Sequence, residues 1–421
     1  MPQARVLEAV EGGREAMVEF LQALVRRPSP LGHEAEAQAL VRAKLEALGL
    51  QVESFEPSVA ELARLPGYSP VEWEYTGRPN VVGRLPSRTR RGRSLILNGH
   101  IDVVSAEPVH HWSRDPWGGQ REDGRVYGRG TADMKGGLAQ MILAVEALQA
   151  AGVALDGDLI VESVIEEECT GNGTLACLAR GITADGAIVA EPHALAAEIA
   201  QLGVLWLRVT VRGRGAHVLG GHRAINAIEK AYVLIRALKA LETEFNREGH
   251  PAYAGVDHPV NFNVGVIRGG DWPSSVPAEC VFEARIGFFP GQSVEAVERR
   301  VTEHLLEAAR TDAWLVENPP AFTSYGFRAE GLVLDRNTEL IRILGGSHRA
   351  IVGRELEFRA TKATTDIRHF NLLYGVPAIC YGPAGGNMHA PDEWVDLESV
   401  VTAAKVLAAF IMEWCGATGR T

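Results

Sequence analysis

The stretch that decides the fold is Leu159-Ile160-Val161-Glu162-Ser163-Val164-Ile165-Glu166-Glu167-Glu168, followed by Cys169-Thr170-Gly171-Asn172-Gly173. An apolar run rich in β-branched residues that stops at a Gly/Asn cluster predicts a buried strand ending in a loop. Three like charges at the end of a buried strand repel one another, so they need a cation or raised pKa values. A solvated acidic turn is the alternative interpretation. The rest of the chain decides between the two.

The composition is typical of a globular enzyme-sized protein. The 421 residues exceed the usual single-core size, which predicts two domains. The net charge of −11 argues against a nucleic-acid or anionic-membrane partner. The N-terminus lacks the apolar region of a secretory signal, and no run of about 18 apolar residues is long enough to span a bilayer. Five scattered cysteines argue against a disulfide framework and a thiolate zinc site, and favour a reducing cytoplasm.

Apolar periodicity predicts an alternation of strands and helices in the first half of the chain. The predicted helices are 14–26, 34–48, 137–148 and 174–180, and the predicted strands are 81–85, 94–97, 159–165 and 186–189. This alternation predicts an α/β fold with a mostly parallel, helix-covered sheet. Ligands of such sheets bind beyond the carboxyl ends of the strands.

The pattern changes after residue 203 and returns after residue 331. The intervening segment predicts strands 204–211, 261–267 and 278–286 with helices 224–241 and 294–309, and the returning pattern predicts helices 339–344 and 400–414 with strand 378–381. We therefore predict a discontinuous catalytic domain of residues 1–203 and 331–421. An α+β domain of residues 204–330, with a four-stranded antiparallel sheet and two helices, is inserted in it.

Candidate metal ligands follow several predicted strands. They are His100 and Asp102, Asp133 in a Gly-rich loop, the Glu triplet, Glu191, and His389 in a second Gly-rich loop. The i, i+2 spacing places Asp102 on the same side as His100, where its carboxylate can accept a hydrogen bond from one ring nitrogen and leave the other for a metal. The loop around Asp133 matches neither nucleotide-binding pattern. The combination favours a pair of divalent ions with N and O ligands, such as Zn, Co or Mn.

These motifs resemble those of the zinc aminoacylase, acetylornithine deacetylase, succinyl-diaminopimelate desuccinylase and glutamate carboxypeptidase family of two-metal hydrolases. The resemblance covers nearly the whole chain. Its most specific pieces are Gly99-His100-x-Asp102-Val103, Tyr127-Gly128-Arg129-Gly130-x-x-Asp133-Met134-Lys135-Gly136-Gly137, the Glu triplet and Asn387-x-His389. The chain has Glu166 where the family usually has Asp, and Cys169-Thr170-Gly171 where a glycine pair is usual. Neither departure removes a ligand.

The resemblance implies a role for each clustered residue. The implied ligands are Asp133 bridging two zinc ions, His100 and Glu191 on one ion, and Glu168 and His389 on the other. Glu167 would be the general base, and Asp102 would support His100. Because this family often has a cis peptide bond after the bridging Asp, we predict one between Asp133 and Met134.

The resemblance also implies that the inserted domain is a lid that joins two subunits in a homodimer. His217 would then reach the partner's active site, although a surface loop histidine is the alternative. Asn263, Arg285, Thr365 and Arg368 match positions that contact substrate in the family. Arg285 suits bidentate capture of a carboxylate.

The implied reaction is hydrolysis of an amide bond in a small N-acyl amino acid or related N-acyl amine. Glu167 would move a proton from the attacking water to the departing amine, and His217 would stabilise the oxyanion. Two other substrates stay open: a dipeptide, and an aromatic or formylated amide bound by the loops at Trp112–Trp117 and Trp272. A metal-stabilised binding protein without turnover is disfavoured, because it would need no base beside the metals.

Overall fold

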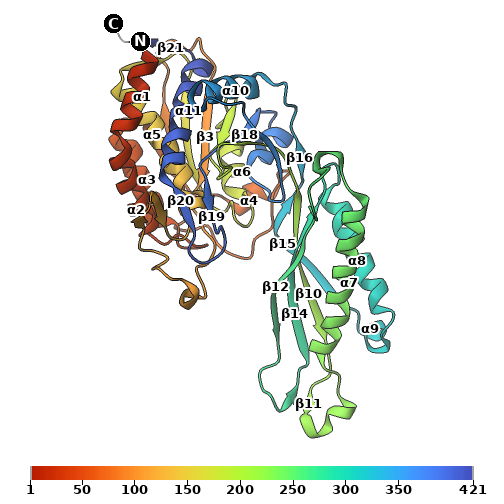
Figure 1. Cartoon of the computed structure of the whole chain (residues 1–421). Helices are drawn as coiled ribbons and strands as arrows, with labels where there is room; N and C mark the ends of the chain where they lie inside the picture. The colour runs from red at the N-terminus through yellow and green to blue at the C-terminus, as the bar shows by residue number, and fades with distance from the viewer. Residues whose placement is uncertain (1, 420–421) are drawn as a thin grey trace.

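The computed structural model describes residues 2–419 and is built around two separate sheets (Figure 1). The larger sheet has the strand order β1-β2-β7-β3-β8-β18. Its strands are β1 (Gln51–Phe55), β2 (Asn80–Leu85), β3 (Leu95–His100), β7 (Leu159–Val164), β8 (Ala187–Val189) and β18 (Ala378–Cys380). β7, β3, β8 and β18 run parallel, whereas β2 is antiparallel to both of its neighbours. The predicted mostly parallel sheet is confirmed.

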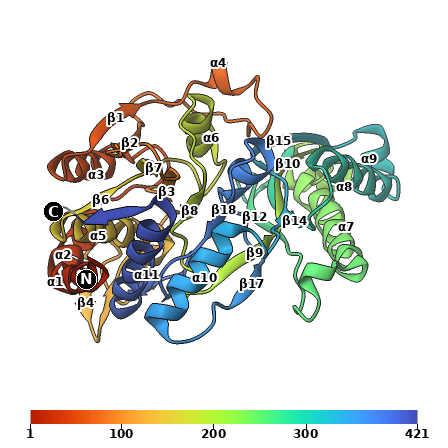
Figure 2. The ribbon, with the colours of Figure 1, turned by 90° about the horizontal axis from the view of Figure 1, so that it is seen from above.

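Helices cover both faces of this sheet (Figure 2). Along β3, Leu95 and Leu97 pack into one core and Ile96 into the other. The first core lies under α1 (Pro2–Gly12), α2 (Arg14–Val25), α3 (Ala35–Ala47), α5 (Gly136–Ala150), α10 (Glu339–Val352) and α11 (Leu397–Cys415). The second lies under α6 (Asn172–Ala179) and the turn His369–Leu373. Burial on both faces explains why these strands are nearly continuous apolar runs.

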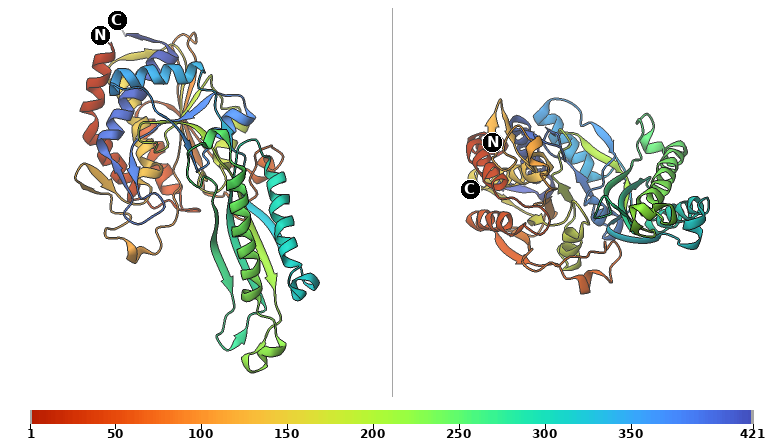
Figure 3. Two further views of the ribbon diagram at one scale, coloured as in Figure 1. Left: turned by 45° about the vertical axis from the view of Figure 1, so that its right-hand side comes forward. Right: turned by 90° about the horizontal axis from the view of Figure 1, so that it is seen from below.

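The second sheet has four antiparallel strands in the order β12-β14-β10-β15 and extends away from the first (Figures 1 and 3). Its strands are β10 (Gly203–Arg212), β12 (Phe262–Gly269), β14 (Glu279–Phe288) and β15 (Ala321–Ala329). Two amphipathic helices, α7 (Ala227–Glu248) and α8 (Val294–Ala309), cover one face. The predicted four-stranded sheet with two helices is confirmed. We propose residues 204–330 as a separate domain, called the lid below.

Two small sheets hold loops near the strand ends. One is β16-β9-β17, formed by β16 (Leu332–Val333), β9 (Ala197–Gln201) and β17 (Phe358–Thr361). The other is β19-β20-β5-β4, formed by β19 (Gly385–Gly386), β20 (Trp394–Asp396), β5 (Arg125–Tyr127) and β4 (Gln120–Glu122). The His389 loop lies between β19 and β20, and β5 leads into the Asp133 loop. The pairing of β20 with β5 therefore brings these two distant loops together.

Some elements differ from the sequence-based expectation. α1 and β15 were not located in the sequence, and α7 and α10 continue to Glu248 and Val352, beyond their predicted ends. The helix α1 and the last strand, β21 (Ala417–Gly419), lie at the end of the molecule farthest from the tip of the lid (Figure 3). Within residues 2–419, no helix has the combination of length and apolarity that a membrane crossing requires.

Candidate metal centre and substrate pocket

Side chains from neighbouring parallel strands meet at one edge of the large sheet. His100 is the last residue of β3, Glu167 and Glu168 follow β7, and Glu191 follows β8. His389 comes from the loop after β18. This is the edge at which an open α/β sheet binds its ligands.

Asp133 lies between the two histidines. Its Oδ1 atom is 3.1 Å from Nε2 of His100, and its Oδ2 atom is 3.4 Å from Nε2 of His389. Oε1 of Glu191 is 3.8 Å from Nε2 of His100, and Oε2 of Glu168 is 3.0 Å from Nε2 of His389. The chain thus forms two groups of three potential ligands that share Asp133. The peptide bond between Asp133 and Met134 is cis, as predicted.

The Asp133 loop is held by Glu393, a buried residue that the sequence analysis missed. Its carboxylate accepts hydrogen bonds from the main-chain N–H groups of Gly130, Ala132 and Asp133 at 3.0, 2.9 and 3.1 Å. Arg129 pairs with the same carboxylate at 2.5 Å. The only signal of Glu393 in the sequence is its place in the His389 loop. Glu393 therefore ties the two loops that carry Asp133 and His389.

Asp102 supports His100 in a different way from the one predicted. Nδ1 of His100 is 2.8 Å from the main-chain oxygen of Asp102, whereas the carboxylate oxygen is 3.6 Å away. The carboxylate instead accepts hydrogen bonds from the N–H groups of Glu167 and Glu168, at 3.2 and 3.1 Å. A carbonyl is the more accessible acceptor because the turn after β3 directs the carboxylate toward these two N–H groups. Asp102 thereby fixes both His100 and the glutamates.

Burial and neighbouring charges shift the pKa values of this cluster. Burial and the nearby Glu191 carboxylate raise the pKa of Glu167 well above its usual value, and burial raises that of Glu191. Burial alone would lower the pKa of His389, but Glu168 and Asp133 raise it to about 11. Oε1 of Glu191 is buried and has no hydrogen-bond partner. Anionic oxygens and imidazole nitrogens in this arrangement fit a pair of divalent metal ions.

Glu166 has a structural environment distinct from that of its two neighbours. It is fully buried, where it pairs with Arg78 at 2.7 Å and accepts hydrogen bonds from the Tyr75 hydroxyl and the Trp73 indole. Arg78 also pairs with the buried Glu34. The side chain of Glu166 therefore anchors the end of β7, and the triplet is not a solvated acidic turn.

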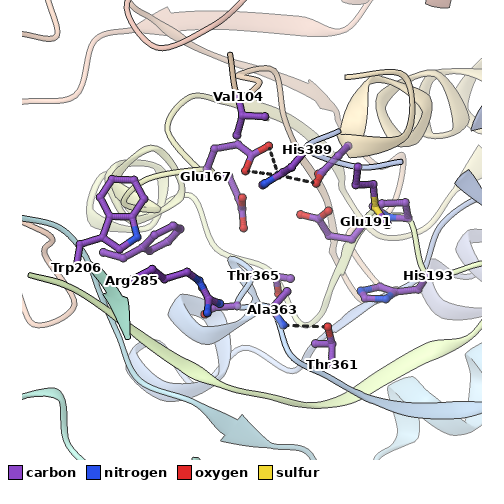
Figure 4. A pocket seen from close by; sticks show the side chains of 16 residues that line it. Val104, Glu167, Glu191, His193, Trp206, Arg285, Thr361, Ala363, Thr365 and His389 are labelled. Atoms are coloured by element: carbon purple, nitrogen blue, oxygen red, sulfur yellow. Dashed lines mark hydrogen bonds and ion pairs between the residues drawn. The ribbon is translucent and has the colours of Figure 1, made fainter. Parts of the chain in front are cut away.

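A cavity of about 400 Å³ lies next to the two ligand groups (Figure 4). Its lining residues are Val104, Asp133, Glu167, Glu168, Glu191, Pro192, His193, Trp206, Arg285, Phe327, Thr361, Ala363, Thr364, Thr365, Met388 and His389. Arg285 and Thr365, which were predicted to contact substrate, both line it. The aromatic wall comes from Trp206 and Phe327, which the sequence analysis missed. The tryptophans of the loops at Trp112–Trp117 and Trp272 do not line this cavity.

Two residues predicted to contact substrate, Asn263 and Arg368, do not line the cavity of this chain, and His217, predicted to act in the partner's site, does not line it either. Asn263 pairs with Arg285 across β12 and β14 but does not line the cavity. Arg368 is buried, donates hydrogen bonds to the carbonyl oxygens of Thr365 and Thr170, at 2.9 and 2.7 Å, and does not line the cavity. His217 is exposed on β11 (Ala216–His217), at the far end of the lid (Figure 3).

The mostly parallel sheet, the four-stranded lid and the paired ligand groups define a metal-dependent amidohydrolase. Residues 96–413 match the model of Peptidase family M20/M25/M40, and the chain belongs to this family. It is 31% identical, over 97% of both chains, to an N-formyl-4-amino-5-aminomethyl-2-methylpyrimidine deformylase of Halalkalibacterium halodurans. It is 27% identical to a succinyl-diaminopimelate desuccinylase of Methylibium petroleiphilum, over 90% of this chain and 92% of that protein. The structure of human carnosine dipeptidase 1 has the same fold, with a TM-score of 0.78 at 17% identity over 98% of this chain and 99% of that chain.

Proposed function

We propose that this chain hydrolyses the amide bond of an N-acyl amine whose amine part is aromatic, with a formylated aminomethylpyrimidine as the first substrate to test. The observation that carries this proposal is the aromatic wall of Trp206 and Phe327, which lines the same cavity as the carboxylates of the candidate metal centre. The full-length similarity to a deformylase of such a compound supports it.

The aromatic wall is built into the lid sheet. Trp206 on β10 and Phe327 on β15 are 5.5 Å apart between ring centroids, in an edge-to-face arrangement. Gly326 has a φ of +60°, and a Cβ atom there would lie 2.4 Å from the Trp206 ring. The tryptophan therefore needs a glycine at this bulge. A planar heteroaromatic ring can pack against this wall with offset or edge contacts.

His100, Asp133, Glu168, Glu191 and His389 would hold the two divalent ions, with Zn²⁺ as the proposed pair and Co²⁺ or Mn²⁺ as replacements. When bound, such a pair supplies an acidified water and polarises the acyl carbonyl. Glu167 lines the cavity and is not needed to complete either ligand group. Its carboxylate is the proposed base that takes the proton of the attacking water and delivers it to the departing amine. Asp102 holds the main chain of Glu167 during this exchange.

The proposed oxyanion donor comes from a second subunit. His217 is exposed at the tip of the lid and does not line the cavity of its own chain. The exposed side chains of Leu219 and Trp272, at 84% and 67%, suit a contact at this tip. We therefore propose a homodimer in which His217 completes the partner's active site and stabilises the developing negative charge.

A second candidate function is favoured by Arg285. Its guanidinium lines the cavity, and Nη2 donates a hydrogen bond to the main-chain oxygen of Lys362 at 3.2 Å. The other guanidinium donors are suited to a substrate carboxylate, as in an N-acyl amino acid or a dipeptide. Succinyl-diaminopimelate, the substrate in the name of one relative, carries such groups.

A hydrolysis panel distinguishes these candidates. It compares kcat/KM for N-formyl-4-amino-5-aminomethyl-2-methylpyrimidine, N-acetylornithine, N-succinyl-diaminopimelate and a dipeptide on the metal-loaded protein. The proposal expects the formylated pyrimidine to be preferred, and Trp206→Ala to lower that kcat/KM more than Arg285→Leu does. A preference for a carboxylate substrate, lost in Arg285→Leu, would establish the second candidate instead.

A further inference from the structure

A third group of potential metal ligands lies beside the pocket: His193, Glu198 and Cys380. They come from the loop after β8, from β9 and from the end of β18, and their ligand atoms all lie within 4.8 Å of one another. Glu198 and Cys380 are buried, whereas His193 is partly exposed and lines the cavity (Figure 4). This group is separate from the two groups that share Asp133.

The buried carboxylate of Glu198 has no well-aligned hydrogen bond, although it lies close to His193. It is 1% exposed, and neither of its oxygens has a hydrogen-bond partner. Nε2 of His193 lies 2.9 Å from Oε2 but also forms no hydrogen bond of acceptable geometry. A buried carboxylate without hydrogen bonds is strongly destabilising. A cation between these atoms would satisfy the carboxylate and the imidazole nitrogen together.

The candidate catalytic metal centre also contains a buried carboxylate oxygen that has no hydrogen bond and faces an imidazole nitrogen. There, a buried oxygen of Glu191 also has no hydrogen-bond partner and faces an imidazole nitrogen, that of His100, at 3.8 Å. Burial raises the pKa of the Cys380 thiol well above its ordinary value and raises that of Glu198. A bound cation would reverse both effects, because metal binding releases the protons of its ligands.

We infer that His193, Glu198 and Cys380 bind a third divalent metal ion, Zn²⁺ by preference. One nitrogen, one oxygen and one sulfur ligand suit zinc, while a thiolate disfavours Mg²⁺ and Mn²⁺. The thiol would lose its proton to solvent as the ion binds, leaving a neutral imidazole, a carboxylate and a thiolate around it. The sequence analysis argued against a thiolate zinc site because no two cysteines are close in the chain. The fold instead combines one cysteine with ligands from two other segments.

Such an ion would connect three segments that lie beside the substrate pocket. His193 is in the same loop as Glu191, and Cys380 is at the end of β18, which pairs with β8. The hydroxyl oxygen of Thr365, another residue that lines the cavity, is 3.3 Å from the sulfur of Cys380. The ion would therefore join the loop that presents Glu191 to β9 and β18.

The test measures the metal content and absorption spectrum of the wild-type protein loaded with Zn²⁺ or Co²⁺ alone. The inference expects three ions per chain. It also expects a thiolate-to-cobalt charge-transfer band in the near ultraviolet from the Co²⁺ form. The proposed catalytic pair has only nitrogen and oxygen ligands, so it contributes no such band. Two ions per chain without the band would overturn the inference.

Matched variants locate the ion. Cys380→Ser and Glu198→Gln should each lose one ion per chain, and Cys380→Ser should also lose the band. Cys177→Ser is the control, because Cys177 is a buried thiol of the same apolar core that contacts Asn80 at 3.4 Å and belongs to none of the three ligand groups. It should keep three ions and the band. A charge-transfer band that survives in Cys380→Ser would overturn the inference. If Cys380→Ser fails to fold, the number of ions bound by Glu198→Gln decides the question.

Discussion

Glu167 and Glu168 are adjacent in the chain, yet the fold gives them different surroundings. Both line the cavity, but Glu168 contacts His389, whereas Glu167 is 3.9 Å from His100. Replacing Glu167 with the isosteric Gln removes the proposed base without emptying a ligand position. We expect kcat to fall by about 10² to 10⁴, with the metal content unchanged. Steady-state kinetics and metal analysis on the same preparation measure both quantities.

The matched control is Glu168→Gln, one position away in the same turn. This change removes an anionic oxygen from the Asp133–Glu168–His389 group, so it should lose metal as well as activity. If Glu167→Gln also lost metal, Glu167 would be a ligand. If it retained full activity, the proposed base would have to be another group.

Arg78 is the cation of a buried cluster next to the catalytic turn. It pairs with Glu34 at 2.5 Å and with Glu166 at 2.7 Å, and all three side chains are at most 5% exposed. Arg78→Met should lower the free energy of unfolding by about 3 to 5 kcal/mol, because it leaves two buried carboxylates without their cation. Urea denaturation measures the loss.

An exposed arginine provides the comparison for Arg78. Arg42 pairs with Glu46 at 2.8 Å on the surface of α3, where both side chains are about half exposed. Arg42→Met should change the free energy of unfolding by less than about 1 kcal/mol. A similar loss in both variants would contradict the prediction, because it would show that burial of the carboxylates does not set the cost of removing their cation.

At this scale the sequence located the carboxylates and histidines of the site but not their partners. His100, Glu167, Glu168 and Glu191 each follow an apolar run, so their place at a sheet edge could be predicted. The atom of Asp102 that accepts the hydrogen bond from His100 could not be predicted. The geometry of the turn, and not the residue type, selects the carbonyl over the carboxylate. Glu393, whose carboxylate binds the Asp133 loop, has no local signal either.

At the scale of elements, α7 is the long helix of the lid, and its start depends on one side chain. Oδ1 of Asn226 accepts hydrogen bonds from the N–H groups of Ile228 and Glu229, at 2.9 and 3.4 Å. Asn226→Ala leaves these donors unsatisfied, so we expect the lid to lose about 1 kcal/mol of stability. Asn226→Asp keeps an acceptor at the same position and should be nearly neutral. Thermal unfolding of the two variants, compared with wild type, gives the difference.

The elements that could be predicted are those in which apolar residues recur at the spacing of a strand or of a helix. β10 alternates buried and half-buried positions from Leu205 to Val211, and α8 has the same bounds as its prediction. β15 mixes aromatic, small and polar residues, and its register shifts against β10 between Leu205 and Leu207. The aromatic wall of the pocket depends on this pairing, since Trp206 and Phe327 meet only across the two strands. Only the folded sheet therefore reveals this wall.

At the scale of the whole molecule, the proposed role of His217 requires two chains for a working active site. The candidate metal centre lies at an edge of the large sheet, whereas His217 is at the opposite end of the lid sheet (Figure 1). The lid strands between them are up to ten residues long and paired over most of their length, so β11 cannot fold back onto its own site without breaking that sheet. A second copy related by two-fold symmetry can supply the histidine without any such change.

Mixing two inactive variants tests this requirement. In homodimers, Glu167→Ala lacks the proposed base in both sites, and His217→Ala lacks the oxyanion donor in both. Subunit exchange produces heterodimers in which one of the two sites has both residues intact. Because half of the dimers in an equal mixture are heterodimers, recovery of about a quarter of the wild-type activity is expected for a two-fold dimer.

Two controls make the outcome decisive. Labelled subunits followed by native mass spectrometry establish that exchange has occurred, and each variant incubated alone must stay inactive. Glu167→Ala mixed with Glu168→Gln cannot restore an intact site, because each site takes both glutamates from one chain and therefore always lacks one of them. Confirmed exchange without recovery in the first mixture would place the oxyanion donor within one chain and remove His217 from the proposed mechanism.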